Sequence, residues 1–567
     1  MAWTSERTSD DPEAVGHPLE GARTAETVES TQPPSYGSTS EDLHEEGHEE
    51  NGHRDSEDSI TEEDAPLLNI SADDPAVSPF RHFKIRTIRR LTYLFLVFSI
   101  IMYLLFIIST FFTIPKLNTH GGNFLIMMDM LIAIGNLGIS LQSFAIPTKS
   151  GRIMNLVMIG FLLLNLILVV SVNKLRNYEG NVFSVLVNLW LLFSVAWIQF
   201  CNYMVERSRV TLEVQVSGHE FTGASRAKKS WKMWFSLVWA LIVLAFLLAL
   251  VVLLTLSILV DSYDSRLSPP GKYVQVEEDL YRIHIYCSSS SVAGNETDNG
   301  NYTGTTILLE PGSVSAETFA RSLIVPEVAE GSRSSIENMR YCYWDRPGLG
   351  FSDNAPSPMS AGMAIDALSD GLNAIGEHGP WILVSEGLGT TYSRIFASRH
   401  SGSVTGLVII DGYDEQYYVN QVSKASYGFG YWMHGFISPL GIDKQLGWIF
   451  GGRTSADRVY GRSQSVSGKY NLARFQEQLA AKTFTKNEII AAADILPRYT
   501  PVAIISSQAK IREIPGWADR QRALYQGGVS DANVAWEIVE NGNNVWDSAN
   551  GRHIVSDIIK QTLEYSA

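Results

Sequence analysis

Five long apolar stretches decide most of what this chain can fold into. A helix needs about 20 apolar residues to cross a bilayer. Five segments reach that length: Leu91–Thr113, Phe124–Ile146, Ile153–Val172, Val182–Met204 and Trp231–Val260. The first contains LTYLFLVFSIIMYLLFIISTFF without a charge, and a helix in the core of a soluble protein rarely has such a sequence. The stretches therefore predict a five-helix transmembrane domain within residues 81–262.

Basic residues in the short loops predict the orientation of these spans, because cytosolic loops carry the excess of Lys and Arg. Thirteen basic residues lie before the first span or in the second and fourth loops, whereas the first and third loops contain three. The N-terminus is therefore predicted to be cytosolic. With an odd number of spans, the residues after Asp261 are expected in a lumen or outside the cell.

The net charge of −16 belongs to the N-terminal tail. Residues 1–80 contain 21 acidic and 3 basic residues, while the rest contains 39 acidic and 41 basic residues. A polar, charged segment with few aromatic residues cannot bury enough apolar area to fold, so residues 1–80 are predicted to be a disordered cytosolic tail. The near-neutral body provides no basic patch, and no nucleic-acid partner is expected.

The tail contains one short motif. Glu63, Leu67 and Leu68 form the pattern Glu-Asp-Ala-Pro-Leu-Leu, which resembles an acidic dileucine sorting signal of endosomal and vacuolar membrane proteins. Sorting adaptors are therefore expected partners of the tail, besides the lipid bilayer around the spans. An ordinary apolar pair is the alternative. A vacuolar or endosomal membrane is favoured, and other organelles, including the mitochondrion, stay open.

Two features after the last span suit a secretory lumen. Asn295 and Asn301 begin Asn-x-Thr glycosylation sequences in a Ser/Asn/Gly-rich loop. Cys287 and Cys342 are the two Cys residues on that side of the membrane, and an oxidising compartment allows a disulfide between them.

Polar residues inside the spans leave two interpretations open. Asp129 lies in the second span, one to two turns from its outer boundary. An ionisable residue in a span is a functional candidate by default. Hydrogen bonding between helices, or contact with interfacial water, is the favoured explanation for Asp129, and transport stays an alternative.

Residues 271–567 have the length of one α/β domain. Short β-rich runs alternate with helical patterns, which predicts a mainly parallel sheet. The predicted strands are Tyr281–Cys287, Thr305–Leu309, Arg340–Trp344, Trp381–Ser385, Gly406–Ile410 and Pro501–Ser506.

The motifs of this domain resemble the α/β-hydrolase superfamily over most of its length. The segment Trp344–Asp353 (WDRPGLGFSD) is similar to the family's strand-four signature and is the most specific match. Gly387-Leu388-Gly389, followed by a helix over Thr390–Arg399, resembles the strand–elbow–helix unit that carries the nucleophile. In this fold the second strand lies beside the fourth, which is compatible with a Cys287–Cys342 bridge.

The resemblance also shows a departure. The family's elbow is Gly-x-Ser-x-Gly, and here Gly387 takes the place of the nucleophilic Ser. Glycine has no side chain with which to form an acyl-enzyme, and it relieves the backbone strain of the elbow. If Ser385 were the nucleophile instead, Leu383 would occupy a crowded position that requires a small residue. We therefore expect a catalytically degenerate site.

The resemblance implies roles for other residues. His553 resembles the catalytic histidine of the last loop, and Asp411 or Asp414 follows strand six and would orient it. The oxyanion donors would be the backbone N–H groups of Leu388 and of Ser313 or Val314. No metal or cofactor is expected, and a small apolar molecule or a lipid is a candidate ligand.

Three hypotheses follow. The first is a membrane protein whose lumenal hydrolase-like domain, residues 271–567, has a binding or structural role. The second is an active ester or lipid hydrolase that uses Ser385 or a water activated by His553. The third is a transport or scaffold protein with an accessory lumenal domain.

Overall fold

The computed structural model describes residues 83–114, 117, 119–144, 148–217, 231–288, 304–312, 314–324, 339–528, 530–540 and 544–566. The chain divides into two units, Met1–Pro66 and Leu67–Ala567, and all the described residues lie in the second. The predicted tail, the sorting residues Glu63, Leu67 and Leu68, the glycosylation sites Asn295 and Asn301, and Ser313 lie outside the described residues.

Five helices are long and apolar enough to cross a membrane, which confirms the five predicted spans. They are α1 (Phe83–Phe111), α2 (Phe124–Gln142), α3 (Lys149–Ser171), α5 (Val182–Ser217) and α6 (Trp231–Asp264), with the short α4 (Asn173–Glu179) after α3. Helices α1 and α5 extend well beyond the predicted apolar runs into polar sequence, because Lys, Arg and Glu form helix as readily as most apolar residues do.

Contacts join four of these helices in a ring. Helix α2 packs against α5 and α6, and α3 packs against the same two helices, so that α2 and α3 are opposite members of the ring. Helix α1 packs outside, against α2 and α5. Helix α2 is the most enclosed of the five. In its most apolar 18-residue segment, 72% of the residues are buried, compared with 17–39% in the other four helices. Its polar side chains therefore face protein rather than lipid.

The C-terminal part is built on one eight-stranded sheet, in the order β1-β2-β4-β3-β5-β6-β7-β8. Strands β1 and β2 run antiparallel to their neighbours, and the pairs from β4 to β8 are parallel. The strands are β1 (Lys272–Val276), β2 (Tyr281–Cys287), β3 (Thr306–Glu310), β4 (Tyr341–Asp345), β5 (Trp381–Glu386), β6 (Val404–Ile410), β7 (Val502–Ser507) and β8 (Asn533–Val539). The six predicted strands are confirmed to within two residues, and β1 and β8 were not predicted.

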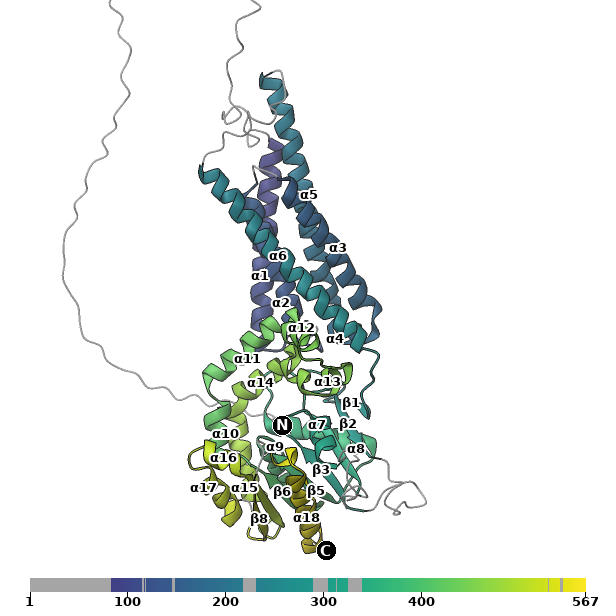
Figure 1. Ribbon diagram of the computed structural model, residues 1–567, viewed down its shortest axis with the longest axis vertical. Coiled ribbons are helices and arrows are strands. Elements are labelled where there is room, and N and C mark those ends of the chain that lie inside the picture. Colours follow the sequence, from purple (N-terminus) through teal and green to yellow (C-terminus); the bar gives the residue numbers. More distant parts are fainter. Residues whose placement is uncertain are drawn as a thin grey trace, which may run out of the picture. The chain divides into compact units, whose positions relative to one another are not determined.

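Helices cover both faces of the sheet (Figure 1). Alternate residues of the central strands enter two separate cores. Leu308, Leu383 and Ile409 pack with α8 (Ala361–Ile375) and α9 (Gly389–Arg399). Their neighbours along the strands pack with α7 (Ala316–Ile324) and α18 (Ala549–Ser566). This mixed, mostly parallel sheet between helical layers confirms the predicted fold class.

Six helices between β6 and β7 form a cap. They are α10 (Glu415–Val422), α11 (Ala425–Ile437), α12 (Ile442–Ile449), α13 (Ser455–Tyr460), α14 (Gly468–Ala480) and α15 (Lys486–Ile495). The cap contacts the apolar helices directly. Arg458 of α13 binds Asp264 of α6 with two hydrogen bonds of 2.7 and 2.8 Å. The Trp432 indole donates to the Thr110 hydroxyl at 3.1 Å.

After β7 the chain forms α16 (Gln508–Glu513) and α17 (Trp517–Ala523). These two short helices follow the carboxyl end of β7, beside the elbow described below.

Candidate functional site

The elbow lies between β5 and α9. Gly387 follows the last residue of β5 with φ +53°, and α9 begins two residues later at Gly389. The Gly387 N–H donates to the Ile410 carbonyl at 3.0 Å, and its carbonyl accepts from the Tyr413 N–H at 3.2 Å. The turn therefore has the left-handed backbone expected of a nucleophile elbow, with a glycine at its apex.

A side chain at position 387 would have space. A Cβ built there would have a Tyr413 ring carbon 3.6 Å away as its nearest contact, an ordinary van der Waals distance. The Tyr413 ring lies over the elbow and packs against Tyr417, with ring centroids 4.8 Å apart. Burial, and then the charge of Glu386, raises the pKa of Tyr413, so its hydroxyl stays protonated. The elbow is thus covered by a neutral aromatic side chain.

The loop after β3 approaches the elbow closely. The Gly312 N–H donates to a carboxylate oxygen of Glu386 at 2.9 Å. A Cβ on Gly312 would lie 2.5 Å from the Leu388 nitrogen, so only glycine permits this approach. An amide that lies beside the elbow is therefore already engaged by a carboxylate, which disfavours a second anion there. Of the predicted donors, Leu388 begins the turn into α9, and Val314 is half-buried just before α7.

Ser385 lies within β5 and not at the elbow. It pairs with Ile409 of β6 and with Glu310 of β3, and it is 1% exposed. Its hydroxyl has no hydrogen-bond partner among the described residues. A nucleophile needs both a base within hydrogen-bond reach and access to substrate, and the structure places neither at Ser385.

Asp411 is held beside the elbow by neutral donors and one lysine. It follows β6 with φ +48°, and its Oδ1 accepts from the Ser507 N–H at 2.9 Å and from the Trp517 indole at 3.2 Å. The Lys510 ammonium lies 3.5 Å from Asp411 and 3.6 Å from Glu386. These contacts hold the Asp411 carboxylate in place at the carboxyl ends of β5, β6 and β7.

The structure does not bring the other predicted residues to this point. Asp414 caps α10 through the Tyr417 N–H at 3.3 Å and pairs with Arg520 at 3.0 Å. His553 lies on α18 rather than in a loop, with 69% of its side chain exposed. Its Nδ1 contacts Asp557 one turn later at 2.8 Å, and among the described residues no contact joins it to Gly387 or Asp411.

A second buried network lies at the ends of β3 and β4. Glu310 accepts from the Trp344 indole and from Arg346, the latter at 2.9 Å. Arg346 also lies 3.6 Å from Glu477 of the cap. Burial raises the pKa of Glu310 to about 7, although the charge of Arg346 opposes the rise. A cavity of about 190 Å³ opens beside this network, between the strand ends and the cap segment that contains Gly461 and Tyr470.

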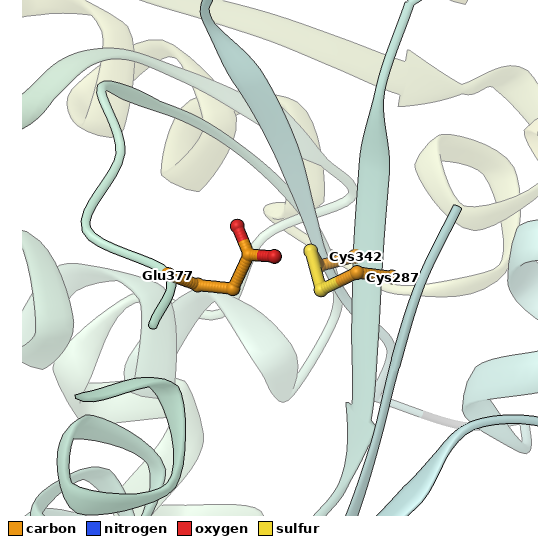
Figure 2. Close-up of side chains that lie close together, drawn as sticks. All are labelled: Cys287, Cys342 and Glu377. Carbon is orange, nitrogen blue, oxygen red and sulfur yellow. A yellow bond between two sulfur atoms is a disulfide. The ribbon is translucent and has the colours of Figure 1, made fainter. Parts of the chain in front are cut away.

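A disulfide joins β2 to β4. Cys287 and Cys342 are register partners on the two strands, and their sulfurs are bonded (Figure 2). Glu377 lies beside them, and the three form a group with spacing suited to a metal ion. Both sulfurs are in the bridge, however, so this group offers no thiolate for a metal. Glu377 instead pairs with Arg340.

Sequence reasoning missed Glu386 and Lys510. The sequence signal for Glu386 was its position next to Gly387. Its hydrogen bond to the loop after β3 could be expected only once β3 and β5 were known to be neighbouring strands. Lys510 lies on α16, just after β7. It contributes the opposite charge, between two carboxylates.

Comparisons with known proteins give relatives of both parts of the chain. A family model described as a region of unknown function (DUF2417) matches residues 42–287. An uncharacterized protein of Schizosaccharomyces pombe is 28% identical over 481 residues, which are 81% of this chain and 88% of that protein. An uncharacterized vacuolar membrane protein of Saccharomyces cerevisiae is 23% identical over 322 residues, 50% of this chain and 49% of that protein. The chain thus spans about half the length of this second relative.

Solved structures similar to this chain include hydrolases. An esterase from Thermogutta terrifontis is 14% identical, with 53% of this chain and 99% of the esterase covered and a TM-score of 0.34. The Cif epoxide hydrolase from Acinetobacter nosocomialis is 16% identical, with 55% and 96% covered and a TM-score of 0.39. The chemistry of this chain therefore has to be judged from its own residues.

Proposed function

We propose that this chain is a membrane protein of the vacuole whose C-terminal domain is a binding or structural module that lacks hydrolase activity. The observation that carries the proposal is Gly387, which occupies the apex of the elbow at φ +53° without a side chain. The engagement of the Gly312 amide by Glu386, and the exposed position of His553 on α18, support it.

The placement of this domain in a lumen is part of the proposal. The predominance of basic residues in the alternate loops supports it. The Cys287–Cys342 disulfide also supports it, since such bridges persist in oxidising compartments. The name of the Saccharomyces cerevisiae relative favours the vacuolar membrane. The tail would contact sorting adaptors on the cytosolic side, and a small apolar molecule or a lipid would be the ligand of the domain.

The test is active-site labelling of the full-length protein with a fluorophosphonate. The wild type is expected to remain unlabelled, and Gly387→Ser tests whether a hydroxyl at the apex is enough to restore labelling. The matched control is Gly402→Ser, since a Cβ at this exposed turn meets nothing within 4 Å and lies away from the elbow. Labelling of the wild type that Ser385→Ala abolishes would overturn the proposal and establish the hydrolase alternative.

A further inference from the structure

Buried polar atoms without partners line the inside of the helical ring. Asp129 Oδ1 and Asn136 Nδ2 of α2 have no hydrogen-bond partner within the described residues, and each residue is 1% exposed. Asn155 Oδ1 and both amide atoms of Asn165 on α3, and Asn188 Oδ1 on α5, also have no partner within the described residues, and these residues are 3%, 0% and 4% exposed. In a bilayer, each polar group without a hydrogen-bond partner costs roughly several kcal/mol of folding free energy. A line of such groups therefore indicates a function.

This set of polar groups, the polar line, has a cavity towards each of its two ends. The first, the interface cavity, has a volume of about 230 Å³ and is lined by Leu125, Val169, Glu179 and Asp261 from the membrane side and by Lys469 from the cap. The second, the bundle cavity, has a volume of about 40 Å³ and lies near the opposite end of the ring. Its lining includes Asn136, Ser140, Asn155 and Asn202.

Helical periodicity places the unpartnered groups between the two cavities. On α2, Leu125 lines the interface cavity, Asp129 lies one turn further on the same face, and Asn136 lines the bundle cavity about 10 Å beyond. On α3, Val169 and Asn155 line the two cavities, and Asn165 lies between them on the same face.

Asp129 and Asn188 form the centre of this line. The Asn188 amide donates to Asp129 Oδ2 at 2.9 Å, which is the hydrogen bond between helices that the sequence favoured. The contact leaves Asp129 Oδ1 and Asn188 Oδ1 unpartnered, and both are acceptors when the carboxyl is ionised. A proton on Asp129 would remove a buried charge and create a donor beside acceptors. The pair therefore suits a proton better than it suits an anion or an apolar ligand.

A second carboxyl, that of Glu179, lies at the interface cavity. Glu179 of α4 lines the interface cavity, and its one described hydrogen bond comes from the Thr119 hydroxyl at 3.4 Å. Burial raises the pKa of Glu179 to about 8, with Asp261 and Asp129 adding to the rise and Lys444 opposing it. The other charged groups that line this cavity are Lys174, Asp264, Arg458 and Lys469.

Most of those neighbours are already engaged. Arg458 pairs with Asp264 at 2.7 Å, and Lys444 pairs with Asp261 at 2.7 Å. Lys469 donates to the Gly350 and Ser352 carbonyls at 2.6 and 2.9 Å. Glu179 has no basic residue within salt-bridge distance in the described part of the chain, so it remains available to exchange protons with the cavity.

We propose that the ring of α2, α3, α5 and α6 conducts protons between the interface cavity and the bundle cavity, with Asp129 as its proton-binding carboxyl. Glu179 delivers protons to Asp129 from the interface cavity. The buried Asn side chains continue the path to the bundle cavity by holding a chain of water molecules. This activity belongs to the membrane helices and is independent of whether the C-terminal domain is inactive.

Proton flux into liposomes tests the proposal. The full-length protein is reconstituted with an entrapped pH-sensitive dye, and a potassium gradient with valinomycin drives proton movement in sodium-free choline buffer. Wild-type vesicles are expected to change internal pH at least tenfold faster than protein-free vesicles. Asp129→Asn is expected to abolish that excess, and Glu179→Gln to reduce it severalfold. Asp519→Asn is the control, because this 81% exposed acid pairs with Arg522 on α17, outside the membrane helices.

Two results would overturn the proposal: wild-type vesicles no faster than empty ones, or an Asp129→Asn flux within twofold of the wild type. If Asp129→Asn fails to fold, dicyclohexylcarbodiimide, which modifies protonated carboxyls in apolar surroundings, replaces the variant. Treatment of the wild type is then expected to modify Asp129 and stop the flux together, as mass spectrometry of the treated protein would show. Flux that persists after Asp129 is modified, or flux that stops while both Asp129 and Glu179 stay unmodified, contradicts the proposal.

Discussion

Glu386 accepts a hydrogen bond from the Gly312 N–H at 2.9 Å, across the boundary between β5 and the loop after β3. The acid immediately before the elbow thus occupies an amide of the loop in which the resemblance expects an oxyanion donor. A nucleophile restored at position 387 would meet a negative charge where its reaction develops one. Under the proposed function, this contact is a second feature beside Gly387 that would disfavour catalysis.

Removal of the Glu386 charge should improve a restored elbow. We expect Gly387→Ser combined with Glu386→Gln to react with a fluorophosphonate about tenfold or more faster than Gly387→Ser alone, because one oxyanion donor contributes about 100-fold or more to rate. The labelling rate constants of the two variants give the comparison. Equal rates would show that Glu386 does not limit the elbow.

The contact between Arg458 and Asp264 should stabilise the packing of the cap on α6. Their side chains are 7% and 6% exposed. Arg458→Ala leaves a buried carboxylate without its partner and should lower the free energy of unfolding by about 3–5 kcal/mol. Thermal unfolding in detergent measures the loss. Arg522→Ala is the control, because its pair with Asp519 is 53% and 81% exposed and should contribute little.

Replacement of both partners should cost less than removal of one. In Arg458→Leu with Asp264→Leu no buried charge remains, so the double variant should unfold at a higher temperature than Arg458→Ala. The opposite order would mean that an unpaired Asp264 carboxylate destabilises the protein less than leucine side chains do at these two positions.

Glu310 should make the protein more stable in acid. Its pKa is raised by burial from 4.5 to about 7, so the folded state binds more protons than the unfolded state between these values. Its contribution is fully present below about pH 4.5 and is lost as the pH rises through about 7. Relative to Glu310→Gln, the wild type should lose about 3 kcal/mol of unfolding free energy over this range. Parallel pH profiles for the two proteins would refute this assignment.

Glycosylation should report the side of the membrane on which the C-terminal domain lies. Asn295→Gln and Asn301→Gln should each remove one endoglycosidase-sensitive step in gel mobility, if residues after α6 are lumenal. Asn69 begins the sequence Asn-Ile-Ser in the acidic tail and provides the control, since Asn69→Gln should change nothing. Mobility that responds to Asn69→Gln alone would reverse the orientation.

The sequence by itself determined the local elements. Uninterrupted apolar runs are too long and too uncharged for anything but membrane helices, and short β-rich runs at regular spacing gave six strands in their observed places. The absence of a side chain at Gly387 could also be seen in the sequence. Recognising it requires only that the strand, the turn and α9 be aligned locally with the elbow pattern. Strands β1 and β8, which were missed, are the two edges of the sheet and are less buried than the central strands.

Only the tertiary structure decided which distant side chains meet. Glu386 with Gly312, Lys510 between two carboxylates, and Asp129 with Asn188 each join elements whose proximity depends on strand order or helix packing. The same applies to His553, whose place in the sequence suits a catalytic loop but whose side chain projects from α18 into solvent. Hydrophobic periodicity fixes the type of each element and the face it buries. The pairing of polar groups depends on how those faces are brought together, which no local pattern encodes.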